Sequence, residues 1–217
     1  MTQKTLLRPF YNAVVFNALI KLGTIAKVSF IVGSQVAFFS LGAICIPLSG
    51  AFAGIAGALS VFGLRMGINF FLTAQIPFEF LAYHIPGLFA SLYWATSNKI
   101  VKVLPAVLCM ILFLAHPVGA QAALYSLFWL IPVYLTLWAP TNLFNTALAS
   151  TFTAHAVGSV IWMYTVSMTP DQWLMLIPVV IAERLLFAVG MVVMYKVMHK
   201  ALVTVGVIWK SVATTQA

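Results

Sequence analysis

The run from Val28 to Leu64 carries no charged side chain, and it is longer than one membrane-spanning helix requires. Only 6% of the 217 residues are charged and 63% are hydrophobic, whereas ordinary soluble domains carry roughly a quarter charged residues. The chain has only 3 acidic residues, Glu79, Asp171 and Glu183, which cannot cover a globular surface with mixed charge. The composition therefore excludes a water-soluble fold and predicts an integral membrane protein.

We predict an all-α fold: a polytopic transmembrane bundle of about six spans, one broken or re-entrant segment and an N-terminal amphipathic helix. Residues 1–27 are too rich in basic side chains to span, so they are predicted to lie on the cytoplasmic membrane surface. The bundle is predicted to occupy residues 28–195, followed by a basic cytoplasmic tail at 196–217. The predicted spans are 28–46, 50–64, 103–116, 120–138, 142–166 and 172–195, and the broken segment is 66–97.

Proline positions define the predicted breaks. The sequence from Ile46 to Gly50 contains Pro47 and is predicted to turn between two spans. Segment 66–97 contains Pro77 and Pro86, each of which interrupts helical hydrogen bonding. Non-helical backbone at membrane depth needs protein or trapped water as a partner, so this segment is predicted to be re-entrant or broken, with one long tilted span as the alternative.

Basic residues orient the predicted bundle, because they are retained on the cytoplasmic side. If segment 66–97 enters and leaves on one face, the lysines and arginines near the predicted span ends fall on that same face. Both termini are then cytoplasmic, and the pattern is typical of a bacterial inner membrane. The net charge of +8 is scattered over span ends instead of one surface, so nucleic acid is not a predicted partner.

An ionisable pair, Glu183 and Arg184, lies in the middle of a predicted span, where charges are costly and often functional. His155 on the preceding span is about as far from the turn at 168–169 as Glu183 is, so the two are predicted to lie at one depth. This His, Glu and Arg cluster could bind a polar ligand, relay protons or clamp two helices together. The sequence leaves these roles open.

Further candidate ligand contacts lie in the broken segment and among the aromatic residues. Glu79 and His84 are candidates because backbone breaks within membranes often border a cavity. Trp129 and Trp162 belong to aromatic residues predicted toward the outer half of the bundle. They are predicted either to form an interfacial belt or to stack on a flat ligand.

Small residues recur at four-residue spacing in the segment that begins at position 50. This spacing lets another helix approach closely within lipid, either from the same chain or from a partner protein. The candidate docking residues are Gly50, Ala53, Gly54, Gly57 and Ala58.

Motifs of membrane enzymes are not found. The sequence contains no His-Glu-x-x-His zinc site, no Gly-x-Ser-x-Gly elbow and no phosphate-binding loop. Cys45 and Cys109 are far apart, both within apolar runs, and are expected to be buried and inert. We therefore predict no enzymatic activity, no metal site and no cofactor.

The predicted six-span bundle, with small-residue packing at Gly50 to Ala58 and no ATPase of its own, resembles the S-components of energy-coupling-factor transporters. In that family a small membrane subunit binds a vitamin or similar micronutrient near the outer face. Small residues dock it to a coupling membrane subunit that connects to ATPases. The branch for nickel and cobalt has histidine directly after the initiator methionine, whereas this chain has Thr2, which disfavours metal transport.

The resemblance implies a substrate-binding membrane subunit for uptake of a vitamin-like organic solute. Its partners would be a small-molecule substrate, the lipid bilayer, a coupling membrane subunit and ATPases. An autonomous proton- or ion-coupled carrier or channel is the first alternative. A structural or assembly subunit of a membrane complex is the second.

Overall fold

The computed structural model describes the backbone of residues 3–25, 27–30, 37–40 and 42–204, and the side chains of 13–25, 42–78 and 80–201. The described chain is helical apart from one two-stranded ribbon, so the prediction of a helical fold is confirmed. In chain order the elements are α1 Gln3–Gly23, β1 Lys27–Phe30, β2 Ala37–Ser40, α2 Gly42–Thr73, α3 Phe78–Ala95, α4 Lys99–Ala115, α5 Pro117–Gln121, α6 Ala123–Ser126, η1 Leu127–Trp129, α7 Leu130–Leu137, α8 Leu143–Thr165, α9 Pro170–Met175 and α10 Ile177–Thr204.

The ribbon of β1 and β2 corrects the first predicted span. The two strands pair antiparallel, with Lys27 opposite Ser40, and α2 begins only at Gly42. The predicted helical span 28–46 is therefore wrong. Hydrophobicity alone does not distinguish a strand from a helix, and the valine and phenylalanine residues of this stretch favour strands.

Helix α2 runs through the predicted turn at 46–50, so that prediction is also wrong. Pro47 is inside the second turn of α2, and the helix continues through it with the loss of one backbone hydrogen bond. The helix is interrupted instead at Gly54, with φ 63° and ψ −162°. Glycine has no Cβ and adopts this positive φ without steric cost.

The predicted broken segment 66–97 contains one break, not two. Helix α2 continues to Thr73, a short turn includes Ala74 at φ 55°, and α3 then runs unbroken through Pro86. The predicted break is therefore present, as a turn between the end of one helix and the whole of the next, and the alternative of one long span is wrong. The predicted span 120–138 is likewise divided, into the successive short helices α5, α6, η1 and α7.

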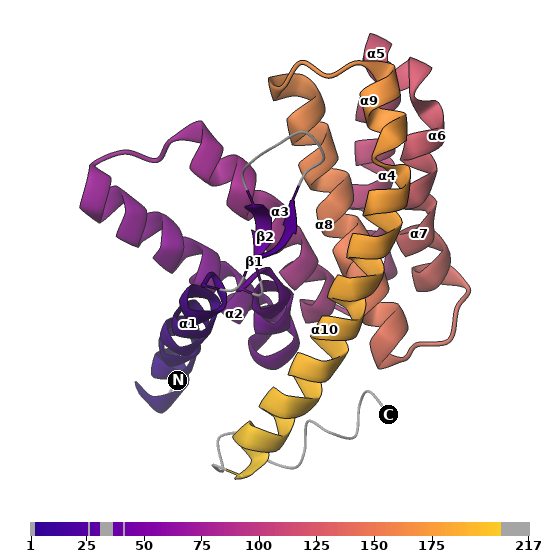
Figure 1. Ribbon diagram of the computed structural model, residues 1–217. Coiled ribbons are helices and arrows are strands. Elements are labelled where there is room, and N and C mark those ends of the chain that lie inside the picture. Colours follow the sequence, from indigo (N-terminus) through magenta and orange to yellow (C-terminus); the bar gives the residue numbers. More distant parts are fainter. Residues whose placement is uncertain (1–2, 26, 31–36, 41, 205–217) are drawn as a thin grey trace.

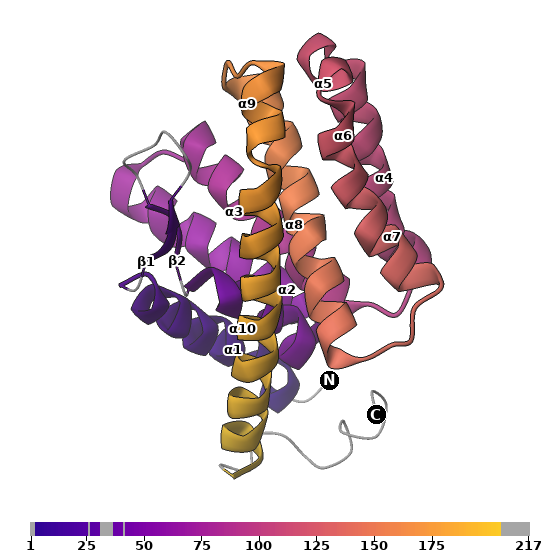
Figure 2. The same ribbon diagram turned by 45° about the vertical axis from the view of Figure 1, so that its right-hand side comes forward.

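The remaining helices assemble around α8, which packs against α3, α4, α7 and α10. In Figures 1 and 2, α5 and α9 lie at one end of this bundle, while the start of α1 and the end of α10 lie toward the other. Helices α2 and α3 pack together as a hairpin that projects to one side in Figure 1. Helix α8 therefore contacts the elements on both sides of the molecule.

Two clusters of buried side chains form the core. The first joins α1, α2, α8 and α10 through residues such as Phe16, Leu48 and Phe187. The second joins α4, α6, η1, α8 and α9, and its largest members are aromatic: Phe113, Tyr125, Trp129 and Trp173. Within the second cluster the Phe113 ring meets the rings of Trp129 and Trp173 edge-on, at centroid distances of 5.0 and 5.2 Å.

Two helices are long and apolar enough to cross a membrane, judged by length and composition: Gly42–Thr73 and the part of α10 from Ile177 to Ala201. Large apolar side chains outside the core are also exposed, among them Phe71 at 89% and Leu72 at 76%. Both observations are consistent with a membrane location.

A capping box formed by Thr169 and Gln172 begins α9. The Thr169 side chain accepts a hydrogen bond from the Gln172 backbone N–H at 3.3 Å, and the Gln172 side chain accepts one from the Thr169 N–H at 2.8 Å. We expect Thr169→Ala to lower the free energy of unfolding by about 1 kcal/mol. Thr169→Ser keeps the cap and should change it little. Equal losses in both variants, measured by denaturant titration in detergent, would contradict this role.

Candidate functional site

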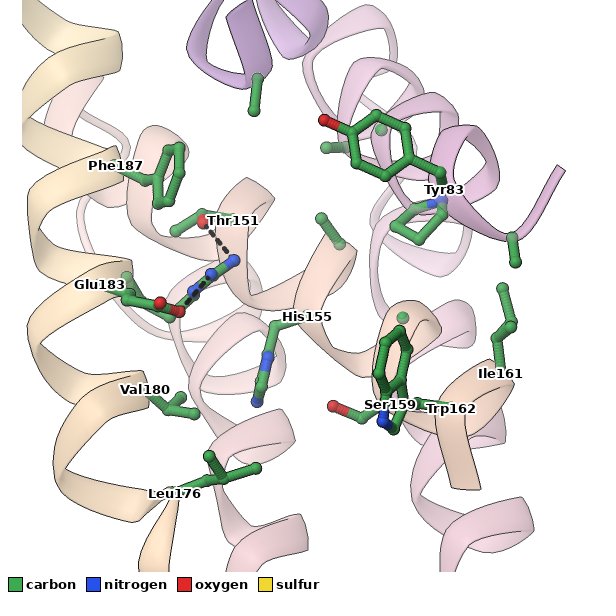
Figure 3. Close-up of a pocket in the computed structure, with 18 of the residues that line it drawn as sticks. Tyr83, Thr151, His155, Ser159, Ile161, Trp162, Leu176, Val180, Glu183 and Phe187 are labelled. Carbon is green, nitrogen blue, oxygen red and sulfur yellow. Dashed lines mark hydrogen bonds and ion pairs between the residues drawn. The ribbon is translucent and has the colours of Figure 1, made fainter. Parts of the chain in front are cut away.

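A cavity of ≈ 750 Å³ lies between α3 and α10, with α8 along its back. Its lining residues come mainly from α3, α8 and α10, joined by the first residues of α2 and by Tyr125 and Trp173. The volume is within the range of pockets that bind small organic molecules, about 300–1,000 Å³. Figure 3 shows side chains from these walls converging on the cavity.

The charged part of the cavity is formed by Glu183 and Arg184 on α10. An Arg184 Nη2–H donates to Glu183 Oε2 at 3.0 Å, and an Nη1–H donates to the hydroxyl of Thr151 on α8 at 3.3 Å. The Arg184 side chain is 4% exposed and that of Glu183 is 14% exposed. The guanidinium carbon also lies 5.0 Å from the ring centroid of Phe187, one turn along α10.

This pairing is unusual for adjacent helical residues, because side chains at i and i+1 project in different directions. Both side chains bend toward each other, so each buried charge gains its opposite charge as a partner. Arg184 also reaches α8, and the ion pair therefore connects α10 to α8.

His155 lies one helical turn after Thr151 on α8 and lines the same cavity. Its ring is surrounded by Tyr125, Phe128 and Phe152, at centroid distances of 5.4, 6.2 and 6.3 Å. Among the described residues, no hydrogen-bond partner is found for its Nε2 atom. The structure thus brings the three predicted residues His155, Glu183 and Arg184 to one cavity. Figure 3 shows His155 and Glu183 facing this cavity, as the count from the turn implies.

The two tryptophans predicted as ligand contacts have different positions. Trp162 lines the cavity on α8, two turns beyond His155 (Figure 3). Trp129 is 0% exposed within the aromatic cluster of the core and is not among the residues that line the cavity. Trp129 therefore packs the wall behind the site.

The two candidate ligand contacts in α3 are Glu79 and His84, and neither is among the described residues that line the large cavity. The side chain of Glu79 lies outside the described residues. His84 does not line the large cavity but a void of ≈ 10 Å³ between α2 and α3, together with Arg65. His84 Nδ1 lies 2.7 Å from the Phe80 carbonyl oxygen, so this nitrogen carries a hydrogen. The cavity residues that α3 does supply include Tyr83 and Pro86.

Several lining residues are not predicted as ligand contacts by the sequence analysis, among them Tyr83, Thr151 and Ser159. A signal exists for two of them, since Thr151, His155 and Ser159 are spaced by four and share one face of α8. Tyr83 has no such signal, because its place depends on how α3 packs against α8.

The candidate docking residues mostly contact their own chain. A Cβ at Gly50 would overlap the backbone of Ser91 on α3, and one at Gly57 would overlap the side chain of Ala53. Ala58 is 2% exposed, and Gly54 forms the interruption in α2. The close approach at Gly50 is therefore an α2–α3 contact within the protein.

Metal and thiol chemistry receive no support from the described part of the chain. Among those residues no group of three or more histidine, cysteine, aspartate or glutamate side chains could hold a metal ion. Cys45 and Cys109 are both buried free cysteines.

Comparison of the chain with protein-family models, curated proteins and solved structures found no match. The functional conclusion therefore depends on the cavity and on the membrane character of the chain.

Proposed function

We propose that this protein is a membrane-embedded, substrate-binding subunit of an uptake transporter for a vitamin-like organic solute. The observation that carries the proposal is the ≈ 750 Å³ cavity, mostly apolar but with a buried ion pair and His155 in its lining. Such a combination suits a small organic molecule, whose apolar body is desolvated while a few polar groups fix its orientation.

The proposed topology has six crossings: α2, α3, α4, the series α5–α7, α8, and α9 with α10. Both termini then lie in the cytoplasm. Support comes from two of these helices, since Lys99 and Lys102 lie at the start of α4 and Lys196 and Lys200 near the end of α10, whereas Arg65 in the outer half of α2 does not follow this pattern. The opposite connections at 74–77, 116 and 166–169 contain no lysine or arginine. This bias follows the positive-inside rule and favours a bacterial inner membrane.

In this topology the cavity faces the outer side. Its lining includes Thr165, Val166 and Met168 at the outer end of α8. Glu183 is six residues into α10, about 9 Å below the outer end of that helix at a rise of 1.5 Å per residue. A solute would enter between α3 and α10 and reach the ion pair with its polar end.

Transport would require partners under this proposal. A coupling membrane subunit and ATPases would supply energy, because the sequence has no phosphate-binding loop. Native mass spectrometry of gently extracted protein tests this directly. A co-purifying organic metabolite with an ATPase-linked subunit supports the proposal. Transport by the purified chain alone in vesicles would favour the autonomous carrier, and a large complex without ligand would favour the structural subunit.

Trp162 provides a sharper test of the cavity. Trp162→Ala removes a large aromatic surface from the lining and should weaken binding of the co-purified metabolite at least tenfold. Trp138 is 69% exposed and is not among the cavity-lining residues, so Trp138→Ala is the matched control and should leave affinity unchanged. Isothermal titration in detergent measures both. Equal affinities for the two variants would place the ligand elsewhere.

A further inference from the structure

The cavity has no net charge in its described lining. Glu183 and Arg184 are the only charged residues there, and they are joined at 3.0 Å. Both side chains are largely buried, at 14% and 4% exposure. A third charge placed beside this pair would lack a counter-charge of its own.

The surroundings make such a third charge costly. Apart from Thr151, His155, Ser159 and a few other polar groups, the cavity surface is apolar, with Ile46, Ile161 and Val180 among its members. Transfer of an unpaired charge from water into such an environment is strongly unfavourable. A carboxylate ligand would compete with Glu183 for Arg184, and an ammonium ligand would compete with Arg184 for Glu183. In both cases the ion pair between Glu183 and Arg184 would be broken, which is costly for buried charges.

We propose that the cavity selects molecules without net charge that have a polar end directed at Glu183 and Arg184 and an apolar body. This inference rests on the proposed function and names the class of its substrate. A neutral amide or urea group fits the pair, because it can donate to a carboxylate and accept from a guanidinium without disturbing the charge balance. Recognition would then depend on hydrogen bonding at one end and on apolar contact along the rest.

Three probes of equal shape test the charge rule: 2-naphthamide, 2-naphthoate and 2-naphthamidine, which are neutral, anionic and cationic. Their affinities for the full-length protein in detergent are measured by isothermal titration at one pH and salt concentration. We expect the amide to bind at least fivefold more tightly than either charged probe. A smaller preference, or a charged probe that binds more tightly, would overturn the inference and leave the proposed function standing. If none of the three raises the melting temperature or gives heat, both the inference and the ligand-binding role of the cavity fail.

Charge variants give a second, independent readout. Glu183→Gln keeps the shape of the side chain but leaves Arg184 as a net positive charge, so naphthoate should gain at least tenfold in affinity relative to the amide. Asp171→Asn removes the same charge from an exposed position on α9 that is not among the cavity-lining residues. It should leave the affinity of naphthoate relative to the amide unchanged. A relative gain of naphthoate below tenfold in Glu183→Gln would contradict the rule. If that variant does not fold, Arg184→Gln is used instead and should favour the amidine. The three wild-type affinities test the inference even if neither variant folds.

Discussion

Glu183→Leu alone is expected to lower the free energy of unfolding by about 3–5 kcal/mol, because it leaves the Arg184 guanidinium buried without its carboxylate. Arg184 is 4% exposed, and Thr151, to which it also donates, is neutral. A single buried charge of this kind costs more than the pair does. The change is measured by equilibrium unfolding in mixed detergent micelles.

The matched control replaces both charges, as Glu183→Leu with Arg184→Met, by apolar side chains of similar volume. This double variant should recover most of the lost stability, since exchange of a buried ion pair for apolar residues is often neutral. Asp171→Asn, at an exposed position, should change stability by less than about 0.5 kcal/mol. A double variant as unstable as Glu183→Leu would show that the pair contributes through geometry that apolar side chains cannot replace.

Gly50→Ala is expected to be the second large effect. The added Cβ would overlap the backbone carbonyl of Ser91, which is part of α3 and cannot rotate away as a side chain would. Helices α2 and α3 must therefore separate, and overpacking of this kind costs about 1–3 kcal/mol. The displacement should also reshape the cavity, because Ile46 on α2 and Gly87 on α3 both line it.

Gly67 is the control for Gly50, since it is an exposed residue of the same helix and a Cβ added there would meet no atom within 4 Å. Gly67→Ala should leave stability unchanged or raise it by up to about 1 kcal/mol through helix propensity. Thermal unfolding of the two variants in the same detergent compares them. Similar losses at both positions would point to a general intolerance of α2 to side chains, instead of a specific α2–α3 contact.

Sequence reasoning predicts the second half of the fold better than the first. The span expected at 142–166 is α8, Leu143–Thr165, because its ends carry clear signals: Asn142 caps one end and the 166–169 turn follows the other. The region from 28 to 64 offers hydrophobicity without such signals. The helix in this region is interrupted at Gly54, and its packing against other helices fixes its path. The presence of Pro47 in the sequence predicts neither.

One part of the candidate site could likewise be predicted from the sequence, and another part could not. His155 and Glu183 could be placed near each other by counting residues from a hairpin turn, since both helices are regular and joined by a short connection. The wall formed by α3 could not be predicted in this way. Its position depends on the path of α2 through the interruption at Gly54, and Tyr83 reaches the cavity only after α3 has packed against α8.

The adjacent placement of Glu183 and Arg184 also bears on how the protein is made. Both charges belong to one helix, so their contact does not need a charged residue from another helix. Under the proposed topology, Glu183 and Arg184 would enter the bilayer as a neutral pair, with a smaller barrier than two separate charges would present. Assembly with α8 then adds the Thr151 hydrogen bond to a pair that already exists. In that topology the two charges are neutralised within α10 before the helix meets α8.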